Sequence, residues 1–209
     1  MEAELDLQAE AGAVVRTVVL GEGTHTVEVS RVFPADRDEV WEACTRPERL
    51  RQWFDTADGE LRPGGRYALA DSGTVGTIEV CERPSRLRLT WEYEDDASTV
   101  EIVLAATGEG RTSLALRHIV TANAHWDEFG PAATGIGWEG ALLALALHLD
   151  GDSRSAPDAM TELFASPPGL EYISRAAEGW GEAHSAAGAE PAAAEAASRK
   201  TAAFYRGEG

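Results

Sequence analysis

The sequence predicts an α+β protein in which an antiparallel sheet curves around one long helix. Two β-branched segments near the start are joined by a short turn, and residues 61–120 contain five further runs of alternating apolar side chains. A strongly apolar segment, Ile136 to Leu149, follows them. Strands and helices do not alternate in the central region, which argues against a parallel doubly wound sheet.

The first predicted element is a β-hairpin. Residues 14–20 are rich in β-branched side chains, residues 21–23 can form a turn, and residues 24–33 alternate, with Val27 and Phe33 on one face. This pattern is typical of two antiparallel strands that bury one face.

Two short helices are expected after the hairpin. Pro34 ends the second strand, and Asp36, followed three residues later by Glu39, resembles a capping box for a helix that runs through Cys44. A second short helix should follow Pro47 and lead into Leu50, Trp53 and Phe54.

The central region is predicted to form an antiparallel meander of five strands. Turn residues such as Pro63-Gly64-Gly65 and Asp71-Ser72-Gly73 separate the strands. Alternation places one row of side chains from each strand on a common face, namely Tyr67 and Leu69, Ile78 and Val80, Leu87, Leu89, Trp91 and Tyr93, Val100, Ile102 and Leu104, and Leu114, Leu116 and His118.

A long apolar helix closes the predicted domain, and a helical extension follows it. Trp138, Leu142 and Leu145 recur at helical spacing within the apolar segment, so this helix should be buried against the sheet. We therefore expect a domain over residues 1–150 and a C-terminal helical pair over residues 151–209 that packs on it.

The charge of the chain argues against two classes of partner. Its formal charge is −18 and its pI is near 4.6, so contact with nucleic acid phosphates or an anionic membrane surface is unfavourable. The acidic start lacks the pattern of a signal peptide, and no apolar run approaches the length of a membrane span. A cytoplasmic location is therefore expected.

No motif for covalent, metal-dependent or cofactor-dependent chemistry occurs in the sequence. Cys44 and Cys81 stand outside any C-x-x-C or Cys/His pattern. His118 with His125, Asp127 and Glu128 matches no metal-ligand spacing, and the last three should lie in a loop before Gly130. We assign no catalytic residue, metal or cofactor.

Short motifs in a fixed order connect the chain to a known superfamily. They lie between about Thr24 and Asp150 and comprise Val29-Ser30-Arg31-Val32-Phe33-Pro34-Ala35, Glu39-Val40-Trp41-Glu42-Ala43, Pro47-Glu48-Arg49-Leu50, Gln52-Trp53-Phe54, Gly64-Gly65-Arg66-Tyr67, Leu87-Arg88-Leu89-Thr90-Trp91, Leu114-Ala115-Leu116-Arg117-His118 and Gly137-Trp138. This ordered set resembles the START-like SRPBCC superfamily, and more closely its branch named for the activator of a heat-shock chaperone's ATPase. The tail is similar to extensions in actinobacterial members.

The resemblance implies a helix-grip fold, while the function stays open. This superfamily includes lipid carriers, polyketide cyclases, hormone receptors and self-resistance proteins, so the fold does not decide among them. The chaperone activator has a further domain before this one, and only about twenty residues precede the match here. A chaperone-regulating role is therefore the last of our hypotheses.

Aromatic and apolar side chains are expected to line an internal pocket for a hydrophobic small molecule. Such rings offer a large contact area with little flexibility to lose. The expected lining residues are Trp53, Phe54, Tyr67, Trp91, Trp138 and Leu142. The alternative is that these side chains simply fill the core.

Two polar residues occupy strand positions whose side chains should point inward with the apolar ones. Arg31 could anchor an acidic ligand, form an internal ion pair, for example with Glu139, or turn to solvent at a bulge. His118 could bind a ligand carbonyl, act as a general acid or base, or be a hydrogen-bonded core histidine.

The sequence favours a binding protein that carries or sequesters a lipid or polyketide-like natural product. A cofactor-independent cyclase, hydrolase or isomerase that uses Arg31 and His118 is one alternative. A self-resistance protein that sequesters a toxic natural product, with or without being sacrificed by it, is another. A homodimer through the C-terminal helices is compatible with the sequence.

Overall fold

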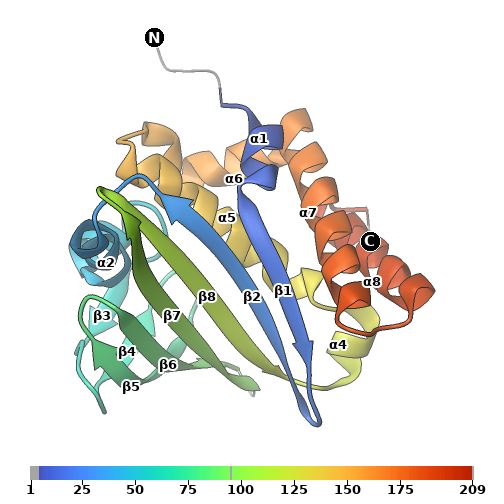
Figure 1. Ribbon diagram of the computed structural model, residues 1–209, viewed down its shortest axis with the longest axis horizontal. Helices are drawn as coiled ribbons and strands as arrows, with labels where there is room; N and C mark the ends of the chain where they lie inside the picture. The colour runs from blue at the N-terminus through green and yellow to red at the C-terminus, as the bar shows by residue number, and fades with distance from the viewer. Residues whose placement is uncertain (1–4, 95, 209) are drawn as a thin grey trace.

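The computed structural model describes residues 5–94 and 96–208 of the chain. Eight strands in these ranges form one antiparallel sheet in the order β1-β2-β8-β7-β6-β5-β4-β3 (Figure 1). Their bounds are β1 Val14–Leu20, β2 Thr24–Phe33, β3 Ala57–Gly59, β4 Arg66–Leu69, β5 Val75–Glu82, β6 Arg86–Tyr93, β7 Asp96–Gly108 and β8 Arg111–Thr121. The first hairpin thus pairs with the last strand, through β2 and β8.

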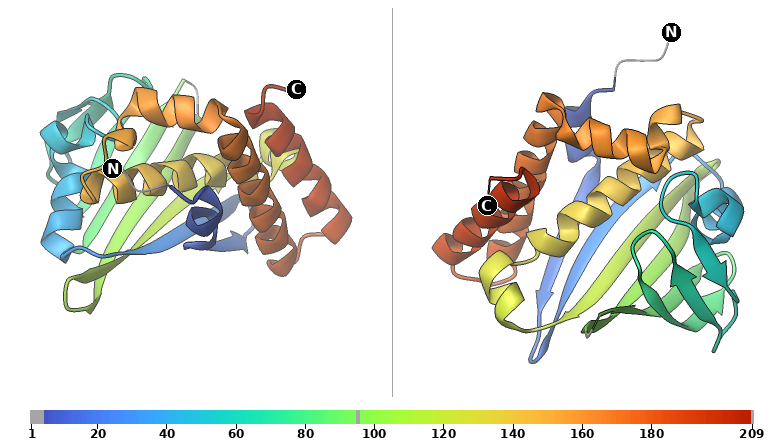
Figure 2. Two further views of the ribbon diagram at one scale, coloured as in Figure 1. Left: turned by 90° about the horizontal axis from the view of Figure 1, so that it is seen from above. Right: turned by 180° about the vertical axis from the view of Figure 1, so that it is seen from behind.

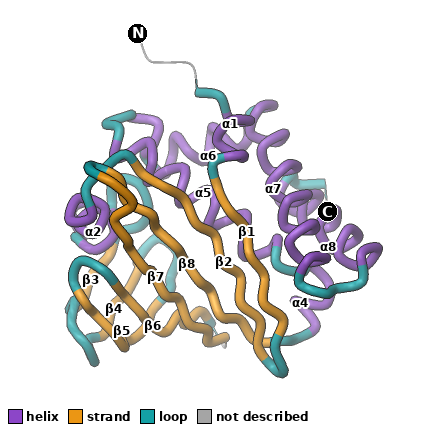
Figure 3. Tube along the Cα trace, viewed as in Figure 1, coloured by secondary structure: helices purple, strands orange, loops and turns teal. Residues whose placement is uncertain are grey.

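Helices lie on the inner side of the sheet and at its ends (Figure 3). Their bounds are α1 Leu7–Gly12, α2 Arg37–Thr45, α3 Pro47–Leu50, α4 Ala124–Phe129, α5 Ala132–Leu149, α6 Pro157–Ala165, α7 Pro167–Ala186 and α8 Pro191–Tyr205, with a 3-10 turn at Ser153–Ser155. The α+β architecture and the helix-grip arrangement expected from the sequence are confirmed.

Helix α5 is the centre of the core. It lies along the concave face of the sheet (Figure 2), where Leu143 and Leu145 are buried with Val27 and Leu114 of the strands. Among the described residues it is the one helix long and apolar enough to cross a membrane by length and composition. More than half of it, 56%, is buried inside the fold, as expected for a core helix.

Three short elements were not predicted from the sequence. Asp6 caps α1 by accepting a hydrogen bond from the backbone of Gln8 at 3.0 Å, and Asn123 caps α4 by accepting one from Trp126 at 3.0 Å. Strand β3 has only three residues and exists through its pairing with β4. The prediction of a loop around His125 was therefore wrong, because a side-chain cap nucleates a helix there.

The predicted capping box of α2 does not form. Asp36 is the N-cap residue, but its side chain makes no capping hydrogen bond. The carboxylate of Glu39 instead pairs with the guanidinium of Arg49 at 2.8 Å. The carboxylate of Glu39 is thus engaged with α3 rather than with the start of its own helix.

The C-terminal region forms three helices that pack on the rest of the molecule. Helix α7 contacts β1 and α5, and Trp180 on α7 is completely buried. A Cβ atom on Gly135 of α5 would lie 2.1 Å from the ring of Trp180, so this contact requires glycine. The sequence predicted a helical pair, and α6 is the additional member.

A buried ion pair joins the first strand to the central helix. The Nε and Nη2 atoms of Arg16 each lie 2.7 Å from a carboxylate oxygen of Glu139, whose side chain is fully buried. Burial raises the pKa of Glu139, and Arg16 opposes this shift. Glu139 was one suggested partner of Arg31, but Arg16 occupies it instead.

Candidate functional site

An apolar pocket of about 310 Å³ lies between α5, the α2–α3 segment and the sheet. Strands β4 to β8 supply its floor and α5 supplies its opposite wall, so the curvature of the sheet creates the space. Its described apolar lining includes Leu50, Leu69, Ile78, Leu87, Leu89, Val100, Ile102, Leu114, Leu116, Ala141, Leu142 and Leu145. These strand residues are the alternating face that the sequence indicated.

Aromatic side chains form one continuous wall of the pocket. The rings of Trp53 and Phe54 lie 5.3 Å apart, Phe54 stacks on Trp138 at 6.1 Å, and Trp138 meets Trp91 edge-on at 5.2 Å. Trp53 donates its indole N–H to the Ala43 carbonyl at 3.1 Å. Fixed rings of this kind suit a flat apolar ligand.

Tyr67 also lines the pocket, but its hydroxyl is already occupied. It donates a hydrogen bond to the Thr90 carbonyl at 2.7 Å, which holds the ring against β6. The structure thus places six of the expected residues in the lining, namely Trp53, Phe54, Tyr67, Trp91, Trp138 and Leu142.

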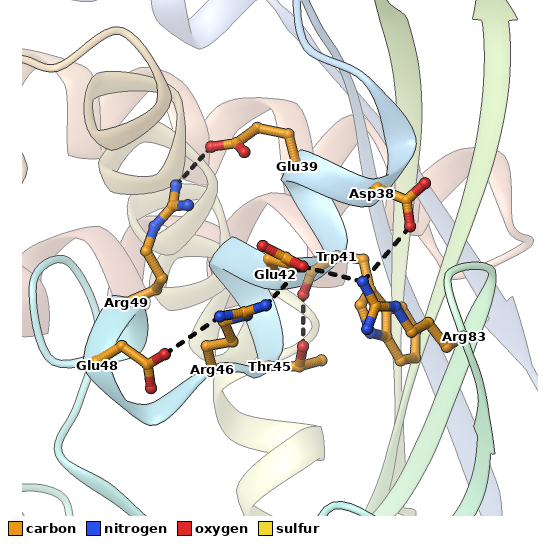
Figure 4. A network of polar contacts seen from close by, with 9 residues as sticks. All are labelled: Asp38, Glu39, Trp41, Glu42, Thr45, Arg46, Glu48, Arg49 and Arg83. Atoms are coloured by element: carbon orange, nitrogen blue, oxygen red, sulfur yellow. Dashed lines mark hydrogen bonds and ion pairs between the residues drawn. The ribbon is translucent and has the colours of Figure 1, made fainter.

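Ion pairs at the edge of the pocket hold the helices that cover it (Figure 4). Glu42 of α2 binds Arg46 and Arg83, each at 2.9 Å, and Arg83 belongs to the turn between β5 and β6. Thr45 Oγ1 donates to the Trp41 carbonyl at 2.7 Å. Helices α2 and α3 are therefore fixed to the sheet while their apolar sides face the pocket.

The pocket opens between α3 and the segment that follows β3. Two of its lining side chains there are strongly exposed, Arg46 at 51% and Glu60 at 62%. Leu61 beside them is also exposed. A polar rim around an apolar interior is typical of a small-molecule site.

His118 lies behind the aromatic wall, in a smaller cavity of about 260 Å³. Its Nδ1 atom accepts the indole N–H of Trp138 at 3.0 Å, and its Nε2 atom is 2.7 Å from Ser98 Oγ. Burial lowers the pKa of His118 to about 4, although Asp96 opposes the shift. The imidazole is therefore neutral at pH 7.

This hydrogen-bond pattern determines which ring nitrogen carries the proton. Because Nδ1 accepts from Trp138, the proton of neutral His118 is on Nε2 and is donated to Ser98. The Ser98 hydroxyl in turn donates to the Trp91 carbonyl at 3.2 Å. A histidine that donates to the serine cannot deprotonate it, so the pair does not form a nucleophile and base.

Arg31 does not line the aromatic pocket. Its Nη1 atom lies 2.6 Å from a carboxylate oxygen of Glu10, and its guanidinium lies 5.6 Å from the centre of the Phe33 ring. Of the interpretations left open by the sequence, the internal ion pair is the one found, with a partner on α1. That partner was missed because α1 itself was not predicted.

Cys44 is a lining residue that sequence reasoning treated as ordinary core. It is on α2, beside the pocket, and burial raises the pKa of its thiol to about 12. The thiol is therefore protonated at pH 7 and a poor nucleophile. Among the described residues no group of three or more His, Cys, Asp or Glu side chains could hold a metal ion.

Comparisons with known proteins agree with this geometry. The model of the family described as activator of Hsp90 ATPase homolog 1-like protein matches residues 34–150. A solution structure of CalU16 from Micromonospora echinospora is 32% identical in sequence to this chain. The match covers 84% of this chain and 97% of the CalU16 chain, with a TM-score of 0.68. The match to a crystal structure of CalU16 has 30% sequence identity and covers 82% of this chain and 98% of the CalU16 chain, with a TM-score of 0.62.

A third similar structure is that of a protein from a biosynthetic locus. DynU16, a putative protein in the dynemicin biosynthetic locus, is 27% identical over 64% of this chain and 50% of that one, with a TM-score of 0.56. The search of the curated proteins found no match.

Proposed function

Because this chain belongs to the family of activator of Hsp90 ATPase homolog 1-like proteins, which has the START-like fold, we propose that it binds a hydrophobic small molecule in the aromatic pocket. It acts as a carrier or a sequestering protein. The observation that carries this proposal is the pocket itself, which is partly enclosed, apolar and walled by Trp53, Phe54, Trp91 and Trp138.

The lining also indicates the class of ligand. A volume of about 310 Å³ is at the lower end of the range for drug-sized ligands, roughly 300–1,000 Å³. Edge-on and stacked rings favour a flat conjugated body, so a polyketide-like natural product fits better than a flexible chain. The likeness to a protein of the dynemicin biosynthetic locus supports the same class.

The enzymatic alternative has less support from the site. Catalysis by proton transfer needs a group that can gain or lose a proton near pH 7. The hydroxyl of Tyr67 is engaged, the thiol of Cys44 stays protonated, and His118 lies behind the wall with both nitrogens occupied. Binding without turnover is therefore the function that we propose.

A self-resistance role is a special case of the same binding. The likeness to DynU16 is the observation that favours it, since a protein of a biosynthetic locus can meet the natural product at its source. Incubation with the candidate toxin, followed by intact mass measurement, separates the two cases. A carrier keeps its mass, whereas a sacrificed protein loses backbone fragments.

The test is a pair of neighbouring substitutions on β6. Leu89 points into the pocket and Arg88 lies on the outer face of the sheet, where it pairs with Glu79. We expect emodin, a flat polyketide, and retinol, an uncharged lipid, to quench tryptophan fluorescence of the unmodified protein. Leu89→Trp should weaken binding by roughly tenfold or more, because the new ring fills the cavity, while Arg88→Trp should not.

Calorimetry and native mass spectrometry give the affinity and the stoichiometry. Circular dichroism of both variants checks that the fold is retained. If neither probe binds, or if Leu89→Trp binds both as well as Arg88→Trp does, the proposed site is wrong.

A further inference from the structure

A second and larger groove lies on the other side of the aromatic wall. It has a volume of about 830 Å³ and is bounded by α5, α6, the start of α7 and the end of α8. Figure 2 shows these C-terminal helices beside α5 in both views. Trp53, Phe54 and Ala141 line this groove as well as the aromatic pocket, so the two spaces share one partition.

The groove is apolar along its length. Its side chains include Ile136, Met160, Phe164, Leu170 and Ile173. On the α5 side, the lining residues at positions 137, 140, 141 and 144 are all glycine or alanine. A Cβ atom on Gly137 would meet only the Tyr205 hydroxyl, at 3.7 Å, whereas one on Gly140 would lie 3.2 Å from the ring of Phe164. From Ile136 to Ala144 the helix rises about 12 Å, enough for an extended hydrocarbon chain.

Arg206 is the one charged residue among the described residues that line the groove, and it lies at one end of it. Its Nη1 atom donates to Ser174 Oγ at 3.0 Å, and its Nη2 atom donates to Glu208 at 2.6 Å. Its Nε atom is buried, and no described residue accepts the hydrogen of that atom. Glu208 is 56% exposed, so this partner can be exchanged for another carboxylate at little cost.

We propose that this groove is a second binding site, which takes an amphipathic carboxylate. The apolar chain lies along α5 between α6 and α7, and the carboxylate replaces Glu208 on Arg206, where the guanidinium edge can donate two parallel hydrogen bonds. The site goes beyond the proposed function, because it needs no ligand in the aromatic pocket.

Dodecanoate is the probe, and calorimetry is the measurement. The titrations use the full chain with Leu89→Trp, which fills the aromatic pocket and leaves the groove as the available site. We expect one molecule to bind. Adding Gly137→Leu should weaken binding by roughly tenfold or more, because the side chain occupies the groove. This substitution replaces an exposed helical glycine, so the fold is retained.

Two further variants test the contact with the carboxylate. Arg206→Gln should weaken dodecanoate binding by roughly tenfold, since a charged hydrogen bond is lost. Glu208→Gln removes the competing carboxylate and should tighten binding. A merely structural role of the Arg206 and Glu208 pair would not move affinity in opposite directions.

The outcomes separate this inference from the proposed function. Dodecanoate that binds the unmodified chain but not the Leu89→Trp chain lies in the aromatic pocket, and this result overturns the second site. Binding to the Leu89→Trp chain that Gly137→Leu leaves unchanged overturns it as well. The same holds if Arg206→Gln and Glu208→Gln leave affinity unchanged. If neither emodin nor retinol binds the unmodified protein while dodecanoate binds as described, the proposed function alone is overturned.

Discussion

His118 shows how the neighbours of one side chain determine its chemistry. A histidine is usually close to half protonated near pH 6.5 and can transfer protons. Here Trp138 and Ser98 occupy both ring nitrogens, and burial keeps the ring neutral. The residue therefore fixes the orientation of Trp138, which is part of the pocket wall.

The lowered pKa of His118 predicts a specific loss of stability in acid. In the unfolded chain His118 takes up a proton near pH 6.5, whereas in the folded protein the pKa of His118 is about 4. The contribution of neutral His118 to stability is thus complete above pH 6.5 and is lost as the pH falls through 4. We expect a difference of about 3 kcal/mol over this range.

Urea unfolding at several pH values measures this effect. His148 and His184 also have lowered pKa values, mainly because they are partly buried, so the unmodified protein alone is not diagnostic. The stability advantage over His118→Gln should shrink from pH 7 to pH 4. An advantage that stays constant with pH would contradict the assignment.

At the scale of elements, α5 has different roles on different faces. Leu142 and Leu145 face the aromatic pocket, while the glycines at 135, 137 and 140 allow contacts with the C-terminal helices on other faces. Phe164 of α6 approaches the Cβ position of Gly140 to 3.2 Å. The glycines let the C-terminal helices approach an otherwise bulky helix.

Two neighbouring glycines on α5 provide a matched pair of substitutions. In Gly135→Ala the new Cβ atom would lie 2.1 Å from the Trp180 ring, so we expect a loss of about 1–3 kcal/mol in unfolding free energy. In Gly137→Ala the new Cβ atom would meet only the Tyr205 hydroxyl, at an ordinary contact distance of 3.7 Å, and the higher helix propensity of alanine should add about 0.5–1 kcal/mol.

Denaturant unfolding of the two variants compares these effects directly. Near-ultraviolet circular dichroism reports whether Trp180 keeps its fixed surroundings. Equal stability of the two variants would show that Trp180 is not held against Gly135 as described.

At the scale of the whole molecule, the C-terminal helices complete the core. Trp180 of α7 is buried against α5, and α7 also covers β1, the first strand of the sheet. Next to this contact, Arg16 and Glu139 form their buried ion pair, and a Cβ atom on Gly179 would lie 2.9 Å from the Arg16 guanidinium. The family match ends at residue 150, but the packing continues beyond it.

This packing predicts that the helix-grip part depends on the extension. A chain that ends at Asp150 would expose the apolar surface under α7 and leave Glu139 closer to water. We expect the full chain to unfold in one transition seen equally by circular dichroism and tryptophan fluorescence. The truncated chain should lose its cooperative transition or show a much lower midpoint, and an unchanged midpoint would contradict the prediction.

Sequence alone determined the features that depend on local pattern. Period-two alternation identified the long strands and their inward faces, and the strongly apolar segment identified α5. Most residues of the pocket wall could therefore be predicted from their position in these patterns. Six of the eight expected site residues line the pocket. The ordered motifs also indicated the correct superfamily.

Only the tertiary structure decided which distant groups meet. Alternation says that Arg31 and His118 point inward, but it cannot say that Glu10 or Trp138 will be the partner. The second groove likewise arises where the consecutive helices α5 to α8 dock together and meet Trp53 and Phe54 from a distant part of the chain. Such contacts depend on how the elements dock, and docking is set by the packing of the whole core rather than by any local run of residues.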